Sequence, residues 1–399
     1  MNHFLYRLQI WHGKLHERTV FSAAVVRGFV SSLFQKRRYD EDYPVDFVVT
    51  WVDGNDPEWQ AKKAEYQPGS TSNKDGAERY RDWSLFRYWF RAVETYAPWV
   101  NRVYLVTDRQ VPGFLNLHSE KIRVVDHTEI IDCRYLPVFN SCAIEANLHK
   151  IPGLSEHFVY FNDDVFLTRP VEKADFFQNG LPKYTLLPKP AKPPRGKSVH
   201  SYQVLTTMGL VNKDFAVRSS ILKHPDKWFS YVNYGTYHLT KQVFSDGYLS
   251  TLASPHLAVP YRKSTWNTVT EKHREEFDET SSHRFRSVFD VIHYAFYEWE
   301  ILSGTFVPVK TDYYGKSYSI DVKEQFLSSL QAIGNFKYRT VCLNDDEFIS
   351  NEAFLEMRDQ YVSAFEAVFP HPSAFEKADP AGAEKAETAE APERFKYSG

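Results

Sequence analysis

Residues 46–56 read Asp-Phe-Val-Val-Thr-Trp-Val-Asp-Gly-Asn-Asp, and residues 157–164 read His-Phe-Val-Tyr-Phe-Asn-Asp-Asp. Each stretch begins with a short run of β-branched and aromatic residues, which is typical of a buried strand. Each then passes into Asp, Asn or Gly residues, which are typical of the turn that ends a strand. These two stretches therefore predict strands at 46–51 and 157–161, each followed by polar groups at its carboxyl end.

The sequence between these two stretches alternates strands with helices. Apolar residues at helical spacing predict helices at about 83–96 and at 141–150. Short apolar runs predict further strands at 102–107 and 122–125. Such alternation indicates a mainly parallel sheet with helices on both faces, so we expect a Rossmann-like α/β fold.

The rest of the chain divides by composition. We expect a helical extension at 1–44, one domain at 45–376 and a disordered Ala/Glu/Lys/Pro-rich tail at 377–399. Within the domain, we expect an α/β part at 45–180 and a more helical part at 204–376, with one helix at 271–277. The five prolines between 181 and 200 predict that 181–203 is a basic loop without regular structure.

Composition excludes several classes of protein. The 399 residues are 43% hydrophobic and 25% charged, as in soluble globular proteins. The net charge of -3 argues against a nucleic-acid-binding protein. The three cysteines have no CxxC spacing, which supports neither a disulfide scaffold nor a thiolate zinc site and fits a reducing cytosol.

The N-terminal region contains an apolar-leaning stretch at 21–34 between basic residues. It is shorter than the ~20 apolar residues that cross a bilayer, and it lacks the small-residue cleavage site of a signal peptide. Two readings stay open: an interfacial amphipathic helix on the inner face of the cell membrane, or a helix packed on the domain. Either way we expect a cytoplasmic protein without a transmembrane segment.

Two acidic clusters, Asp53 to Asp56 and Asn162 to Asp164, follow predicted strands. Ligands of open α/β sheets bind beyond the carboxyl ends of the strands, and carboxylate oxygens suit Mg²⁺ that bridges to substrate phosphates. Taken alone, each cluster is also explained as an ordinary turn, because Asp, Asn and Gly are common turn residues.

Other polar residues are open to two interpretations. Arg79 and Asp82 precede a helix and either grip phosphate or form a solvated helix start. His256 is either structural or a general base, for which its ordinary pKa is suited. The residues alone predict a metal-and-phosphate site on an α/β fold.

The chain also resembles the stealth-type phosphotransferases, which include bacterial capsule hexose-1-phosphate transferases and the animal GlcNAc-1-phosphotransferase. The resemblance lies in four blocks: 46–56, 79–165, 256–286, and 341–345 with 369–376. It implies a glycosyltransferase-A-like core, a UDP-sugar donor such as UDP-GlcNAc, a glycan or lipid-linked acceptor, and a Mg²⁺ or Mn²⁺ cofactor.

The resemblance also implies roles for individual residues. Catalytic roles fall on His256, Arg286 and Asp164, donor binding on Trp51, Asp53, Gly54, Asp56, Arg79, Asp82 and Asn162, and metal binding on Asp163, Asp164, Asn344 and Asp345. This chain departs from the family pattern at Trp83, where Asn is usual, and at Arg109, where Gly is usual. The recognition modules of the animal enzyme are absent, which favours a bacterial glycan or lipid-linked acceptor.

We therefore expect transfer of a hexose-1-phosphate, with release of UMP, in capsule or cell-surface polysaccharide synthesis. One alternative is a metal-dependent glycosyltransferase that attacks the anomeric carbon and releases UDP. Another is a non-catalytic glycan-binding or scaffold protein.

Overall fold

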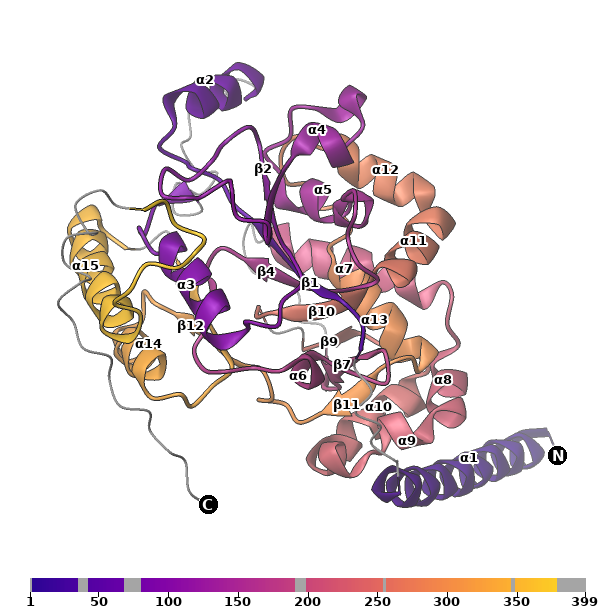
Figure 1. Ribbon diagram of the computed structural model, residues 1–399. Helices are drawn as coiled ribbons and strands as arrows, with labels where there is room; N and C mark the ends of the chain where they lie inside the picture. The colour runs from indigo at the N-terminus through magenta and orange to yellow at the C-terminus, as the bar shows by residue number, and fades with distance from the viewer. Residues whose placement is uncertain are drawn as a thin grey trace, which may run out of the picture.

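A five-stranded sheet forms the centre of the computed structural model, which describes residues 2–34, 42–67, 80–190, 199–253, 256–345 and 349–378 (Figure 1). The strand order is β10-β4-β1-β2-β3. The strands are β1 (Val45–Thr50), β2 (Val103–Thr107), β3 (Ile122–Asp126), β4 (His157–Asn162) and β10 (Val259–Arg262). The first four are parallel, and β10 pairs with β4 in the antiparallel sense. The predicted mainly parallel α/β fold is confirmed.

The described residues also form three smaller sheets. Their orders are β12-β13-β5, β11-β7-β6 and β8-β9. The strands are β5 (Val165–Leu167), β6 (Phe177–Gln178), β7 (Leu181–Thr185), β8 (Pro188–Lys189), β9 (Thr251–Leu252), β11 (Val307–Val309), β12 (Gly315–Ser319) and β13 (Thr340–Asn344).

The described residues form helices that cover both faces of the central sheet and others, such as α1, that lie away from it. They are α1 (Asn2–Leu33), α2 (Pro57–Tyr66), α3 (Phe86–Tyr96), α4 (His127–Ile130), α5 (Ser141–Glu145), α6 (Lys173–Phe176), α7 (Val199–Asn212), α8 (Val217–Lys223), α9 (Pro225–Trp228), α10 (Tyr237–Asp246), α11 (Lys263–Lys272), α12 (Arg274–Ser282), α13 (Tyr294–Ser303), α14 (Lys323–Gly334) and α15 (Asn351–Val368). Short 3₁₀ turns lie at η2 (Cys133–Tyr135), η3 (Leu148–Lys150) and η4 (Tyr231–Thr236).

Alternate side chains of each central strand enter two different cores. On β1, Phe47 and Val49 pack with the core that includes α3, α14 and α15, whereas Val48 packs with the core that includes α5, α7, α11 and α13. Figure 1 shows these two groups of helices on opposite sides of the strands. The period of two along a strand sends successive side chains to opposite faces, so a strand buried on both faces reads as a continuous apolar run.

Three predicted helix boundaries are wrong. The helix expected at 83–96 begins at Phe86, because Ser84 has a φ of 57° and its N–H donates to Asp82 in a turn. The helix expected at 141–150 breaks into α5 and η3, where the Asn147 side chain donates to the Ala143 carbonyl at 2.8 Å. The helix expected at 271–277 is divided between α11 and α12, with His273 at the junction.

The prediction that 181–203 lacks regular structure is also wrong for its described part. Residues 181–185 form β7, residues 188–189 form β8, and α7 begins at Val199, while 191–198 lie outside the described residues. Pro182 sits opposite Phe177 in an antiparallel pair, and Pro188 opens a two-residue strand. Proline is tolerated at the start of a strand and in positions that donate no ladder hydrogen bond.

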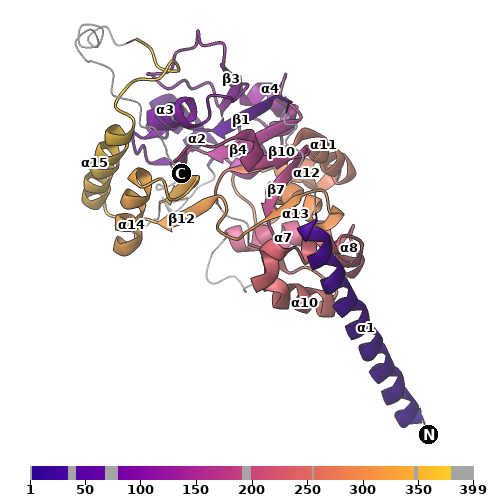
Figure 2. The same ribbon diagram turned by 60° about the horizontal axis from the view of Figure 1, so that its bottom comes forward.

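The N-terminal helix α1 packs on α9, and Figure 2 shows its N-terminal end extending away from the rest of the molecule. Ala24 is buried, and a Cβ atom on Gly28 would lie 2.1 Å from the Pro225 carbonyl oxygen. Phe21 makes an edge contact with Phe229. The reading of a helix packed on the domain is therefore observed. In the part of the chain that the structure describes, no helix has the length and apolar character required to cross a membrane.

The C-terminal part of the domain returns to the first helix of the α/β part. Buried Arg91 donates to Glu376 at 2.8 Å, and Phe375 is buried against Phe90. The disordered tail was expected to begin at 377. From 379 onwards it lies outside the described residues.

Candidate active site

The candidate site lies at the carboxyl end of β4, where the chain turns through Asn162 to Asp164 before β5 begins. β10 runs antiparallel to β4, with Val259 opposite Tyr160. The residues just before Val259 therefore run beside the residues just after Tyr160. This register brings His256 to the acidic turn, although no local feature of the sequence around His256 indicates such a neighbour.

His256 contacts three side chains at this turn. Its Nε2 atom forms a short contact with the Asn162 amide and lies 3.8 Å from Asp164 Oδ1. Its Nδ1 atom lies 3.5 Å from Cys342 Sγ. The His256 side chain is 38% exposed, so a molecule in the site can reach the imidazole from solvent.

Cys342, which was not among the residues predicted for the site, enters it because β13 pairs with β5. Cys342 lies opposite Val165, and the N–H of Leu343 donates to the Asp164 carbonyl at 3.0 Å. The Cys342 thiol donates to Asp164 Oδ2 at 3.3 Å. Cys342 lies in the fourth block of the family resemblance, at 341–345. Nothing in that block distinguished Cys342 from the apolar residues beside it.

Arg286 reaches the site on a segment that is fixed to the start of α5. The Phe139 N–H donates to the Arg284 carbonyl at 2.7 Å, and the Asn140 amide donates to the buried Asp290 carboxylate at 3.0 Å. Asp290 also accepts from the Ser287 N–H at 2.8 Å. These contacts hold Arg286 so that its Nη2 atom donates to Ser141 Oγ at 2.8 Å.

A polar path joins Arg286 to the acidic turn through two buried side chains. Glu145 lies one helical turn beyond Ser141, and its Oε1 atom accepts from the Tyr160 hydroxyl at 3.2 Å. The same hydroxyl oxygen lies 2.6 Å from Asn162 Oδ1. Burial raises the pKa of Glu145 to about 7, although the positive charge of Arg286 opposes the rise. The structure thus places Arg286 and His256 at the two ends of one connected set of side chains.

The acidic turn itself carries an excess of negative charge. Although Asp163 is exposed by surface area, packing of protein atoms around its carboxylate and the charges of Asp164 and Asp82 raise its pKa above the ordinary range. Asp164 Oδ1 is buried and has no hydrogen-bond partner among the described residues. Clustered carboxylates and a buried oxygen without a donor fit a cation, so the residues present suit the expected divalent metal.

Asp345, which was predicted to bind the metal, is already paired. It accepts from Arg81 at 3.2 Å and from the Trp83 indole N–H at 3.1 Å. Asn344 ends β13, and its amide donates to the Asp345 carbonyl at 3.4 Å. Trp83, which departs from the family pattern, therefore connects the start of the second block to the fourth.

Predicted donor-binding residues form the turn after β1. Asp56 caps α2 by accepting from the Glu58 N–H at 2.9 Å, and its hydrogen bond from Gln110 is the chief cause that lowers its pKa. Asp53 accepts from the Asn55 N–H at 2.9 Å. The ordinary turn reading is thus observed for this cluster, and donor binding stays a prediction.

Three further donor-binding predictions have different outcomes. Gly54 is closely covered, since an added Cβ atom would lie 2.3 Å from the Tyr80 carbonyl oxygen. The half-buried Trp51 ring is stacked on Phe86 with centroids 5.5 Å apart. Arg79 lies outside the described residues.

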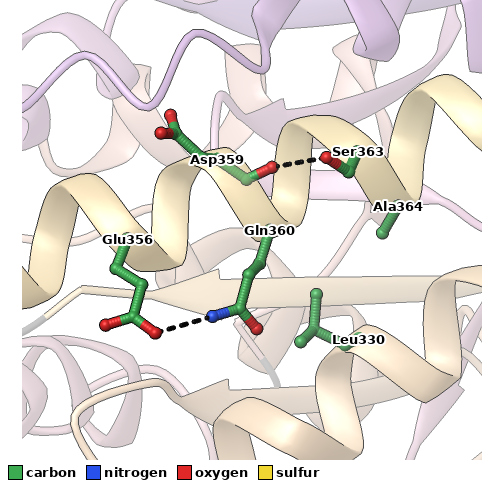
Figure 3. Close-up of a pocket in the computed structure, with 6 residues that line it drawn as sticks. All are labelled: Leu330, Glu356, Asp359, Gln360, Ser363 and Ala364. Carbon is green, nitrogen blue, oxygen red and sulfur yellow. Dashed lines mark hydrogen bonds between the residues drawn. The ribbon is translucent and has the colours of Figure 1, made fainter.

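A separate hollow of about 540 Å³ lies between α14 and α15 (Figure 3). Glu356 and Gln360 bond to each other along α15 at 3.3 Å, and Leu330 of α14 lies beside them. The hollow is lined by none of the candidate site residues. We therefore assign it no part in the chemistry of the acidic turn.

Taken together, an imidazole and a group of carboxylates lie at the end of β4, and a guanidinium is connected to them through Ser141, Glu145 and Tyr160. Such groups handle a phosphate-bearing substrate: the imidazole accepts a proton, the guanidinium binds phosphate oxygens, and carboxylates hold a cation.

Comparison with known families matches three segments of this chain to conserved regions of stealth proteins. Residues 43–71 match stealth protein conserved region 1, residues 79–184 match region 2, and residues 255–297 match region 3. The matched regions contain Asp163, Asp164, His256 and Arg286.

Two curated relatives match most of the chain. Receptor polysaccharide phosphotransferase WefC of Streptococcus oralis is 41% identical over 83% of this chain and 99% of its own length. Capsular polysaccharide phosphotransferase WcwK of Streptococcus pneumoniae is 40% identical over 83% of this chain and 99% of its own length. Among solved structures, an active-site mutant of LgtC overlaps with a TM-score of 0.33 at 9% identity over 80% of this chain and 95% of that chain. That overlap is too loose to relate individual site residues.

Proposed function

The chain belongs to the stealth protein family, and from this membership we propose that it transfers a hexose-1-phosphate from a UDP-sugar to an acceptor hydroxyl and releases UMP. The sugar is an N-acetylhexosamine, and the phosphodiester formed belongs to a capsular or other cell-surface polysaccharide. The observation that carries the proposal is the connection of His256 and Arg286 to the acidic turn after β4.

The reaction is an in-line displacement at phosphorus. The acceptor oxygen bonds to the sugar-proximal phosphorus while the bond from that phosphorus to the bridging oxygen breaks, and UMP leaves with the bridging oxygen. The acceptor hydroxyl proton passes to the His256 imidazole, which is solvent-accessible at the site. General-base assistance of this kind contributes ~10²–10⁴-fold in rate.

Arg286 stabilises charge on the oxygens of the transferring phosphate. A guanidinium binds two phosphate oxygens at once, and phosphoryl transfer depends chiefly on such positioning and neutralisation of charge. Asp290, through the segment that it holds, positions Arg286 without touching substrate.

Asp163 and Asp164 would hold Mg²⁺ or Mn²⁺, with Asn344 and Asp345 as further ligands. When bound, the cation offsets the negative charge of the donor diphosphate. Asn162 and Asp82 lie beside these carboxylates and complete the donor side of the site.

Nucleotide release tests the reaction type. Purified protein is incubated with a panel of UDP-sugars, acceptor glycan and Mg²⁺, and the products are followed by nucleotide chromatography and phosphorus NMR. UMP together with a phosphodiester signal supports the proposal. Release of UDP would instead show a glycosyltransferase, and absence of turnover with every donor would favour a glycan-binding or scaffold protein.

The N-terminal helix supports a peripheral position at the inner face of the cell membrane, where lipid-linked acceptors are found. Val26, Val30 and Leu33 recur at helical spacing and remain 64%, 47% and 52% exposed, while the opposite face packs on α9. Exposed apolar side chains on a helix, with basic residues close in the sequence, favour contact with an anionic bilayer.

A further inference from the structure

The spacing of the cysteines in the sequence argues against a thiolate metal site, but the fold assembles one from three distant segments. Asp164 comes from the turn after β4, His256 from the start of β10 and Cys342 from β13. One ligand atom from each of these residues lies within 4.8 Å of the other two.

The distances fit a tetrahedral cation. With Zn–S near 2.3 Å and Zn–N near 2.0–2.1 Å, two ligands of one tetrahedron stand about 3.5 Å apart. Cys342 Sγ lies 3.5 Å from His256 Nδ1 and 3.3 Å from Asp164 Oδ2. These two separations are close to those between neighbouring ligands of one ion.

Two further observations favour a bound ion. Asp164 Oδ1 is buried without a hydrogen-bond partner among the described residues, so this carboxylate lacks a full set of contacts. Asn162 contacts the His256 ring at Nε2, and Nδ1 on the other side of the ring faces the thiol, so the ring already presents one nitrogen toward Cys342. The partial exposure of His256 provides an entry path.

We propose that Asp164, His256 and Cys342 form a cation site that shares Asp164 with the expected Mg²⁺ site, that it is selective for a thiophilic divalent ion such as Zn²⁺, and that its occupation inhibits transfer. Zn²⁺ accepts sulfur and nitrogen ligands, whereas Mg²⁺ prefers oxygen ligands. On binding, the Cys342 thiol loses its proton to solvent and the thiolate bonds to the metal. The lone pair of His256 is then engaged by the ion and no longer accepts the acceptor proton.

The inhibition rests on the proposed function, but the binding does not, so binding is measured first and without substrate. Purified protein is titrated with Co²⁺, which replaces Zn²⁺ in such sites, and the thiolate-to-cobalt charge-transfer band is recorded before Zn²⁺ is added as competitor. We expect one equivalent of Co²⁺ to give the band. Cys342→Ser and Cys342→Ala should lose the band, whereas Cys133→Ser, which alters an exposed cysteine outside the site, should retain it.

The proposal is overturned if the wild-type protein gives no band, or if both Cys342 variants retain it. Because Cys342 is buried, thermal unfolding without metal identifies a variant that fails to fold, and the second variant then decides. The two replacements test the same sulfur with different side chains.

A second measurement tests inhibition at constant Mg²⁺. The Zn²⁺ concentration that halves UMP release should rise by at least about tenfold in a folded Cys342 variant, as expected for loss of a metal ligand. Equal sensitivity of the variant and the wild-type protein would overturn the inhibitory role. If no UDP-sugar is turned over at all, the proposed function fails while the cobalt measurement still decides the cation site.

Discussion

Arg286 Nη2 lies 2.8 Å from Ser141 Oγ, although 145 residues separate the two in the chain. This contact fixes the segment that carries Arg286 against the first turn of α5. Ser141 is also close to Glu145, which bonds to Tyr160 on β4. The helical part of the domain therefore contributes a guanidinium that is connected to the acidic turn of the α/β part.

Replacement of Arg286 by Lys should show whether transfer needs only a positive charge at this position or also the planar shape of the guanidinium. Lysine keeps the positive charge but cannot bind two phosphate oxygens in a fork. We expect kcat to fall by about 10²-fold, as for loss of one donor to a transition state. Steady-state UMP release measures the change. Arg87→Lys, at an exposed position on α3, serves as control and should retain activity; comparable losses in both variants would contradict the role of Arg286.

Replacement of His256 by Ala should nearly abolish transfer and largely preserve donor binding. Loss of a general base costs ~10²–10⁴-fold in rate, whereas the carboxylates that would hold the diphosphate cation remain. Single-turnover kinetics and calorimetric titration with the UDP-sugar measure the two effects separately. His118→Ala, at an exposed position, is the control. Parallel loss of binding and turnover in His256→Ala would assign this residue to the donor pocket instead.

Glu145 predicts a pH dependence of stability. Burial raises its pKa to about 7 from the ordinary value of 4.5. Between those values the folded protein retains a proton that the unfolded chain releases, so the free energy of unfolding decreases as pH rises through this window. The change is on the order of 3 kcal/mol above pH 7.

Glu145→Gln has no such titration. It should therefore be more stable than the wild-type protein at pH 8 and nearly equal to it at pH 4.5, as measured by urea unfolding. Glu120→Gln, at an exposed position, should show no difference at either pH. A stability difference between Glu145→Gln and wild type that stays constant across this range would rule out the shifted carboxyl.

The strands around the site could be predicted because their signal is local. β1 and β4 are buried on both faces, so their apolar runs mark them to within one residue. The helix breaks could not be predicted from the sequence. The break after α5 depends on Asn147, whose amide also donates to Ser281 on α12. The spacing of apolar residues within 141–150 gives no indication of that long-range contact.

The acidic turn, His256 and Arg286 were identified through the family resemblance, but their connection was not. The position of Arg286 depends on Asp290, whose buried carboxylate bonds to side chains from other elements. Cys342 depends on the pairing of β13 with β5, which joins residues far apart in the chain. Long-range registers of this kind leave no local pattern, so the site composition emerged only from the fold.

Metal dependence distinguishes the predicted metal ligands. A chelator should abolish turnover, and Mg²⁺ or Mn²⁺ should restore it. Asp163→Asn should raise the Mg²⁺ concentration for half-maximal rate by about tenfold or more, because an anionic oxygen ligand is lost. Asp345→Asn should raise it less, because Asp345 already pairs with Arg81 and Trp83. If Asp345→Asn needs a higher Mg²⁺ concentration for half-maximal rate than Asp163→Asn does, the cation lies closer to β13 than proposed.

The exposed apolar face of α1 predicts binding to anionic vesicles. Val30 and Leu33 point away from the domain, since they are 47% and 52% exposed while Ala24 and Gly28 pack inward. The double replacement Val30→Asp with Leu33→Asp should leave folding intact and lower flotation with phosphatidylglycerol vesicles by about tenfold or more, because it removes apolar area and adds like charge. Val111→Asp with Leu117→Asp changes two residues that are 44% and 54% exposed elsewhere, so it should float as the wild-type protein does. If both double variants lose flotation equally, general surface charge rather than α1 determines membrane binding; if neither does, α1 serves only to cover α9.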